Sequence, residues 1–168
     1  DEDYPGPLED GDLYLNGELI TDLVIPNGVK EIKKNAFFGA VNISSVSIPY
    51  SVTTIGESAF AYCLGLTNLT IPDSVINIGA NAFYSCRNLA SVTVGNGVTK
   101  IGKLAFSNCV NLSSITLGNS VKVLDECLFQ GCSKLTQKIG EGWIRITDGT
   151  VVDSNTLLKD IDYDIIKA

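Results

Sequence analysis

Five phenylalanines recur at a fixed spacing of 23 residues, at Phe37, Phe60, Phe83, Phe106 and Phe129. A unit this short cannot bury its own apolar face, so it must stack on copies of itself. A fixed period of this length is typical of a solenoid. We therefore predict one elongated repeat domain whose stability comes from the contacts between neighbouring coils.

When the repeats are aligned on this period, their apolar residues form columns that predict the core. Alternation in Val46-Ser-Ile48 and Leu69-Thr-Ile71 predicts a short strand with one buried face. Pro26, Pro49 and Pro72 end that strand, because proline lacks the donor that a ladder needs. The following Val-x-x-Ile-Gly predicts a second extended segment, and Ala-Phe-x-x-Cys predicts one helical or 3-10 turn on the opposite side.

The consensus Leu-x-x-Leu-x-Ile-Pro-x-Ser-Val-x-x-Ile-Gly-x-x-Ala-Phe-x-x-Cys resembles the BspA-type, or treponemal-type, leucine-rich repeat, over residues 22–136. The resemblance implies a repeat solenoid, a right-handed leucine-rich-repeat coil of short β-strands with short helical or 3-10 turns on the other side. Members of this family are mostly secreted or cell-surface proteins of host-associated bacteria, and several are described as adhesins. The terminal repeats depart from the consensus, with Lys33 and Asp125 in place of glycine, as end units of a solenoid often do.

Both ends of the repeat array are predicted to be caps that cover apolar flanks and strand edges. Residues 1–21 form an N-terminal tail and a β-hairpin around Asn16-Gly17, which is a strong hairpin signal. Residues 137–168 form a C-terminal cap, with a second hairpin around Asp148-Gly149 and a short helix within residues 155–166. Trp143 is expected to lie over the last core layer.

Four of the five cysteines occupy one repeat column, and the fifth, Cys127, stands outside it. A column residue points into the same strip in every coil, so buried free thiols are the favoured interpretation. Disulfides between adjacent coils remain an alternative. A zinc site is disfavoured, because ligands in a row do not converge on one ion. The column consists of Cys63, Cys86, Cys109 and Cys132.

Composition disfavours several classes of function. The chain has no histidine, so it lacks the usual general base and any Ser-His-Asp or Cys-His pair. It shows no phosphate loop or dinucleotide fingerprint, and we expect no catalytic residue, no metal site and no cofactor. A net charge of −7 disfavours nucleic acid as a partner. No apolar run reaches the ~18 residues of a membrane span, and the start at Asp1 fits a secreted chain whose signal peptide has been removed.

The outward positions of the repeat strands carry small uncharged polar side chains, which we call the polar strip. Solenoids commonly bind partners on such an extended face, so we expect a protein ligand there, such as a host matrix or cell-surface protein. Two alternatives stay open. Serine and threonine are also common at exposed strand positions without any binding role. The repeats can also serve as a spacer or stalk that presents another domain. The strip consists of Ser45, Ser47, Asn68, Thr70, Ser91, Thr93, Ser114 and Thr116.

Overall fold

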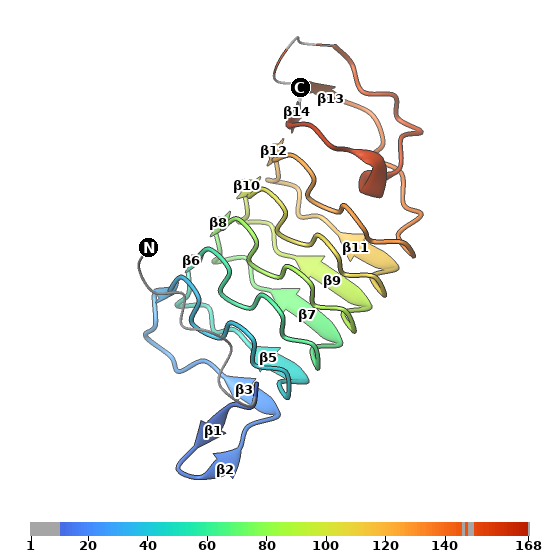
Figure 1. The fold of residues 1–168 in the computed structure, drawn as a ribbon. Helices are drawn as coiled ribbons and strands as arrows, with labels where there is room; N and C mark the ends of the chain where they lie inside the picture. The colour runs from blue at the N-terminus through green and yellow to red at the C-terminus, as the bar shows by residue number, and fades with distance from the viewer. Residues whose placement is uncertain (1–10, 146, 148–149, 168) are drawn as a thin grey trace, which may run out of the picture.

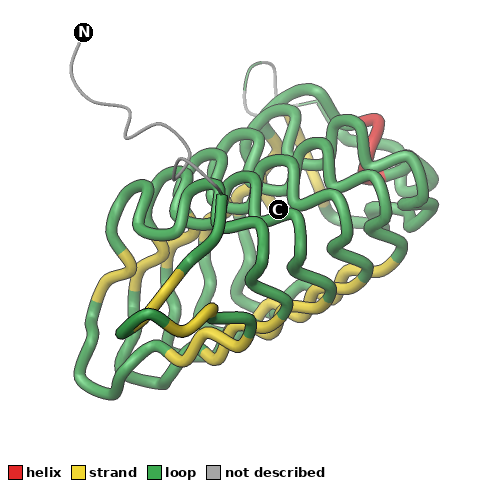
Figure 2. Tube along the Cα trace, turned by 60° about the horizontal axis from the view of Figure 1, so that its bottom comes forward, coloured by secondary structure: helices red, strands yellow, loops and turns green. Residues whose placement is uncertain are grey.

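The protein is a stack of coils with a hairpin at its N-terminal end and a cap at its C-terminal end (Figure 1). The structure is a computed structural model, and it describes residues 11–145, 147 and 150–167. Each coil contributes two short strands, which form two separate rows along the stack (Figure 2). This arrangement is the β-solenoid that the 23-residue period predicts.

The first strand of each coil carries the polar strip. Its neighbours pair in parallel with a shift of one whole repeat, so that Asn68, Ser91 and Ser114 are direct partners. The ladder is interrupted once, which leaves a two-stranded sheet and a three-stranded sheet on this face. The strands are β3 (Asp22–Val24), β5 (Ser45–Ser47), β7 (Asn68–Ile71), β9 (Ser91–Val94) and β11 (Ser114–Thr116).

The second strand of each coil belongs to a continuous seven-stranded sheet. Its five repeat strands are parallel, and two antiparallel strands of the cap extend it at the C-terminal end. In order, the strands are β4 (Glu31–Ile32), β6 (Thr54–Ile55), β8 (Asn77–Ile78), β10 (Lys100–Ile101), β12 (Val123–Leu124), β14 (Ile165–Lys167) and β13 (Trp143–Arg145).

The third side of each coil was predicted to be a helical or 3-10 turn, and it consists of single turns closed by i→i−3 bonds without a continuous helix. The N–H of Ala59 closes a turn onto the Gly56 carbonyl at 3.3 Å, whereas the next N–H, of Phe60, reaches the Ala82 carbonyl of the following coil at 2.8 Å. A helix needs every N–H to bond within its own segment. Here alternate N–H groups bond to the next coil instead, so the side is built of turns and a third inter-coil ladder.

The turns require left-handed backbone at two positions in every coil, which also stops a helix from propagating. Glycine, asparagine and serine supply most of these positions, and the exceptions are Leu104, Tyr62 and Cys127, with φ of 59°, 62° and 55°. The first set is Asn35, Ser58, Asn81, Leu104 and Cys127, and the second is Gly39, Tyr62, Ser85, Asn108 and Gly131.

The phenylalanine column forms the centre of the core. Phe60, Phe83 and Phe106 are fully buried, and neighbouring rings stack with centroids 5.3 Å apart. Their planes lie within 2° to 4° of parallel, so each ring closely repeats the orientation of the last. Most members of the apolar columns around them are buried, while Leu23, Val46 and Leu117 are partly buried and pack against the core, which continues through the whole stack.

Glycine sets the spacing between coils on the side of the second strand. A Cβ atom on Gly79 would lie 2.6 Å from the Glu57 nitrogen of the preceding coil, so no side chain fits. Asp125 takes the place of this glycine in the last coil. Its N–H bonds to the Ile101 carbonyl at 3.2 Å, whereas the equivalent bond from the Gly102 N–H to the Ile78 carbonyl is 2.9 Å. The ring spacing from Phe106 to Phe129 widens in parallel to 5.9 Å. The last coil is therefore held less closely than the others.

The N-terminal hairpin is present as the sequence predicts. It consists of β1 (Tyr14–Leu15) and β2 (Glu18–Leu19), joined by Asn16 and Gly17 with φ of 54° and 85°. Two positive φ values fit the type I′ turn that matches strand twist. Asn42 ties the hairpin to the first coil, because its side chain accepts the Leu13 N–H at 2.8 Å and donates to the Ile20 carbonyl.

The C-terminal cap differs from its prediction. Residues 155–166 were expected to form a short helix, but they contain only a 3-10 turn, Leu158–Asp160, and then enter β14. The open edge of β12 explains the difference, since pairing satisfies its backbone groups and buries Ile165 completely. The turn predicted at Asp148-Gly149 lies outside the described residues. Trp143 is only 4% exposed and joins the core, as predicted.

Candidate binding face

The polar strip lies on one side of the molecule, on β5, β7, β9 and β11. All eight residues point outward, seven of them are exposed, and Ser91 is half-buried. The register aligns them in two rows, one of which contains Thr70, Thr93 and Thr116. The structure therefore brings the predicted residues onto one face.

The two rows differ in what their side chains already bind. In the first row, Ser45 Oγ donates to Asp22 Oδ1 at 2.5 Å, and Ser91 Oγ donates to Asn68 Oδ1 at 2.6 Å. Thr70, Thr93 and Thr116 make no side-chain hydrogen bond to any described residue. Their hydroxyl groups can each donate and accept, so the threonine row is the part of the strip that is available to a partner.

The interruption of the ladder divides the strip. Between β5 and β7 no strand pairing forms among the described residues, and one bond, from the Thr67 N–H to the Ser44 carbonyl at 3.3 Å, links the neighbouring turns. The uninterrupted part is therefore the three-stranded sheet of β7, β9 and β11. The periodic sequence gives no sign of this break.

Two residues of the first coil extend the strip and were missed by the sequence reasoning. Asp22 and Val24 occupy the same columns as Ser45 and Ser47, and Val24 is 68% exposed. Their columns are visible in the sequence, but the predicted strip begins at the second repeat. They add one charge and one apolar side chain to a face that is otherwise neutral and polar.

Side chains along the margin of the strip have a structural role. Asp73 Oδ1 accepts the N–H of Asn96 at 2.6 Å, and Asn96 Oδ1 accepts the N–H of Asn119 at 3.1 Å. Each side chain thus replaces a ladder bond where the chain turns away from the strand. Tyr50 occupies the same column in the second coil and is 76% exposed.

A row of aromatic residues lies on the turn side, where the sequence reasoning found no candidate. The ring of Tyr62 packs edge-on against Phe38 and Tyr84, with centroid distances of 5.3 and 5.5 Å. A hollow of about 350 Å³ beside it is lined by apolar groups that include Val41 and Leu64. Aligning the repeats does not reveal this row, because Phe38 and Tyr84 occupy one alignment column and Tyr62 occupies the next.

All five cysteines are free thiols. Those of the column are fully buried, and each donates to the carbonyl of the phenylalanine in the preceding coil, as Cys86 Sγ does to Phe60 at 3.2 Å. Burial raises the pKa of Cys63 and of Cys132 to about 12, and that of Cys86 and Cys109 further. A thiol that stays protonated is neither a nucleophile nor a metal ligand. The favoured interpretation of the column as buried free thiols is therefore confirmed, and the disulfide alternative is not.

Within the described part of the chain, no group of three or more cysteine or acidic side chains is placed to hold a metal ion. The same residues contain no helix that is long and apolar enough to cross a membrane. The geometry offers surfaces for recognition, and the polar strip is the most extended of them.

Comparison with known proteins gives the same repeat. A family profile described as the BspA type leucine rich repeat region matches residues 12–136 with six copies. A leucine-rich repeat protein of Treponema pallidum, TpLRR, is 34% identical with a TM-score of 0.63 and aligns over 66% of this chain. A leucine-rich repeat protein of Eubacterium ventriosum is 28% identical, with a TM-score of 0.68 over 73% of this chain. The comparison with curated proteins found no significant match.

A third solved structure, described as a leucine rich cell surface protein of Faecalibacterium prausnitzii, is 27% identical with a TM-score of 0.51 over 58% of this chain. The chain spans 52%, 33% and 32% of the lengths of these three structures, respectively. The matched profile covers most of the sequence and all of the stacked coils. The chain therefore belongs to the BspA-type leucine-rich repeat family.

Proposed function

We propose that this chain is a non-catalytic protein-binding module of a secreted or cell-surface bacterial protein. It adheres to host proteins or to other cells through the polar strip. The observation that carries the proposal is the exposed threonine row of Thr70, Thr93 and Thr116, whose hydroxyls have no partner among the described residues. The cell-surface description of the Faecalibacterium prausnitzii structure supports the location.

The strip suits a protein partner for two physical reasons. Its strands are held by the ladder and by a fully buried core, so its backbone loses little further freedom on binding. Its side chains are uncharged on β7, β9 and β11, so recognition rests on hydrogen bonds and shape.

The alternative is a structural spacer that presents another domain. The continuous phenylalanine stack favours it, because it joins the coils through one uninterrupted buried core. A spacer needs no particular chemistry on the strip. The two functions therefore differ in how they tolerate a large charged side chain at Thr93.

The test is binding of the purified module to an array of host matrix proteins, cell-surface proteins and glycans. Thr93→Arg and Thr116→Arg place a bulky cation on the threonine row, while Asn77→Arg makes the same change on an exposed strand position of the other sheet. We expect saturable binding that both threonine variants abolish and that Asn77→Arg preserves, with circular dichroism confirming the fold. Binding that survives both threonine variants would show that the strip is not the binding site, whereas no binding by a folded module favours the spacer.

A further inference from the structure

The sheet that carries the polar strip ends on an unpaired strand. The cap closes the other sheet, because β14 pairs with β12 and β13 pairs with β14. On the strip side, β11 pairs only with β9, and no described strand pairs with its C-terminal edge. The two sheets of one solenoid thus finish differently.

The sequence explains why a sixth strand does not form. One repeat beyond Ile115 and Thr116 stand Lys138 and Ile139, so continued pairing would bury the lysine and expose the isoleucine. The chain instead leaves the sheet. The Ile139 N–H bonds to the Thr156 carbonyl at 2.9 Å, and Lys138 forms an antiparallel bridge with Leu157.

The departure leaves backbone groups of the last coil without the partners that earlier coils have. The carbonyl of Ala90 accepts the N–H of Ser113, but the Ser113 carbonyl accepts no bond from any described residue. Ile25 donates to the Ser47 carbonyl of the next coil, whereas its equivalent Leu117 donates to none of the described residues. Between them, the Ile115 N–H is met by a side chain, Gln137 Oε1, at 3.3 Å.

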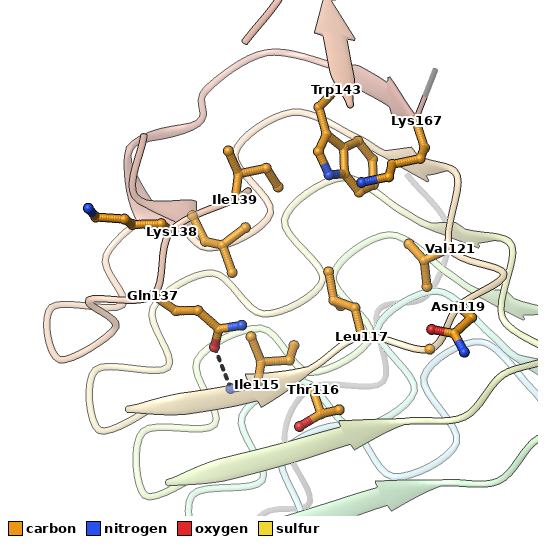
Figure 3. A pocket seen from close by; sticks show the side chains of 12 residues that line it. Ile115, Thr116, Leu117, Asn119, Val121, Gln137, Lys138, Ile139, Trp143 and Lys167 are labelled. Atoms are coloured by element: carbon orange, nitrogen blue, oxygen red, sulfur yellow. Dashed lines mark hydrogen bonds between the residues drawn. The ribbon is translucent and has the colours of Figure 1, made fainter. Parts of the chain in front are cut away.

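A hollow of about 420 Å³ lies where the sixth strand would run, between β11 and the cap (Figure 3). Figure 3 shows Leu117, Val121, Ile139 and Trp143 around its interior. Thr116, Asn119 and Gln137 form a polar rim, and the Lys167 ammonium lies 5.2 Å from the centre of the Trp143 ring. The hollow therefore combines an apolar interior with an open strand edge.

We propose that this edge and hollow bind an extended segment of the partner protein, which adds to β11 as a parallel strand. Its alternate residues are apolar and enter the hollow, while those between them are small and polar and prolong the strip. This proposal rests on the proposed function, since it names the part of the protein ligand that the strip contacts. Strand addition of this kind gains affinity from backbone bonds and selectivity from the pockets for alternate side chains.

The chemistry of the expected segment follows from the coils themselves. Every earlier coil offers its neighbour a strand of this pattern, such as Ser91-Val-Thr-Val94, in which Val92 and Val94 are buried and Thr93 is exposed. A partner segment of the same pattern meets the same backbone groups at the same two-residue spacing. No charge complementarity is needed, because the backbone supplies the polar contacts.

The test uses the fluorescence of Trp143, which is the sole tryptophan and lines the hollow. The probe is a synthetic peptide with the sequence of residues 89–96, Leu-Ala-Ser-Val-Thr-Val-Gly-Asn. We expect a saturable change in emission with a Kd below about 1 mM. The same peptide methylated on the threonine nitrogen, which loses the amide proton that should face β11, should bind about tenfold more weakly.

Protein variants separate this proposal from the proposed function. Thr116→Arg and Asn119→Arg both place a large side chain at the hollow and should abolish peptide binding, and either suffices if the other fails to fold. Thr93→Arg lies one coil away, so it should preserve peptide binding while abolishing binding of the host protein. A folded module with no fluorescence response, or equal binding of the methylated peptide, overturns strand addition and leaves the proposed function untouched.

Discussion

The cysteine column makes the stability of this protein depend on pH in a way that a single substitution can expose. Each of the four thiols is buried, uncharged and donates to a phenylalanine carbonyl of the preceding coil, as Cys109 does to Phe83 at 3.3 Å. Burial disfavours the thiolate and raises the pKa of Cys109 above its ordinary value of 9.0. The perturbation we consider is Cys109→Ala, which removes one of these groups.

The sign of the effect follows from proton binding. Between about pH 9 and pH 12 the unfolded thiol ionises while the folded thiol keeps its proton, so the native state binds more protons. The free energy of unfolding therefore falls as pH rises through this window, and it is unaffected below it. For one thiol with an unfolded pKa of 9.0, linkage gives a loss of about 1.4 kcal/mol at pH 10. Four such thiols lose about 6 kcal/mol, which is comparable to the whole stability of many domains.

The assay is urea unfolding of the wild type and of Cys109→Ala at pH 7 and at pH 10, under reducing conditions. At pH 7 the substitution should cost about 1–2 kcal/mol, for the lost packing and the lost thiol bond. At pH 10 this cost should shrink by about 1.4 kcal/mol, because the variant no longer has the thiol that the unfolded chain ionises.

Phe106→Leu is the matched control, since it perturbs the same layer of the core without a titrating group. Its cost should be equal at the two pH values. If the cost of Cys109→Ala is also equal at pH 7 and pH 10, the thiol is not held protonated by the fold and the reasoning is refuted.

Two further substitutions test the contacts between coils. Gly79→Ala places a Cβ 2.6 Å from the Glu57 nitrogen, so we expect a loss of about 3 kcal/mol in urea unfolding. Lys33→Ala, in the same column of the first coil, has no preceding coil and should be nearly neutral, so equal losses would contradict this account. Leu104→Asn relieves a left-handed residue with φ of 59° and should raise the midpoint of urea unfolding by the equivalent of about 1 kcal/mol. The reciprocal Asn81→Leu should lower stability by a similar amount, and a loss in both variants would show that packing outweighs backbone strain.

Much of this fold can be predicted from the sequence because the local structure of one repeat is reproduced in every repeat, and stacking the repeats then defines the whole domain. Residues one repeat apart, such as Phe60 and Phe83, meet the same environment in every coil, so a column of identical residues must stack. The strands that start each coil, the buried cysteine column and the hairpin at Asn16 and Gly17 all follow from patterns of this local kind. The members of the polar strip follow as well, because alternation along a strand decides which residues face outward.

Other features arise only where different parts of the chain meet. The turn side resembles a helix in sequence, yet its alternate N–H groups find carbonyls in the next coil, which no single repeat encodes. Residues 155–166 become a 3-10 turn and a strand because β12 presents an open edge to them.

The sequence by itself determined the repeat, its core and the composition of the outward face, because these depend on contacts between equivalent residues. The tertiary structure alone decided the break between β5 and β7 and the aromatic row that contains Tyr62. The sequence shows at Lys138 and Ile139 why no sixth strand follows β11, but only the tertiary structure shows that no other described strand covers its edge. These features depend on contacts between residues that are not equivalent, and on the fact that no further coil follows the last one to pair with its strand. A periodic pattern describes what each coil shares with the next, so it carries no information about the places where one coil differs from its neighbours.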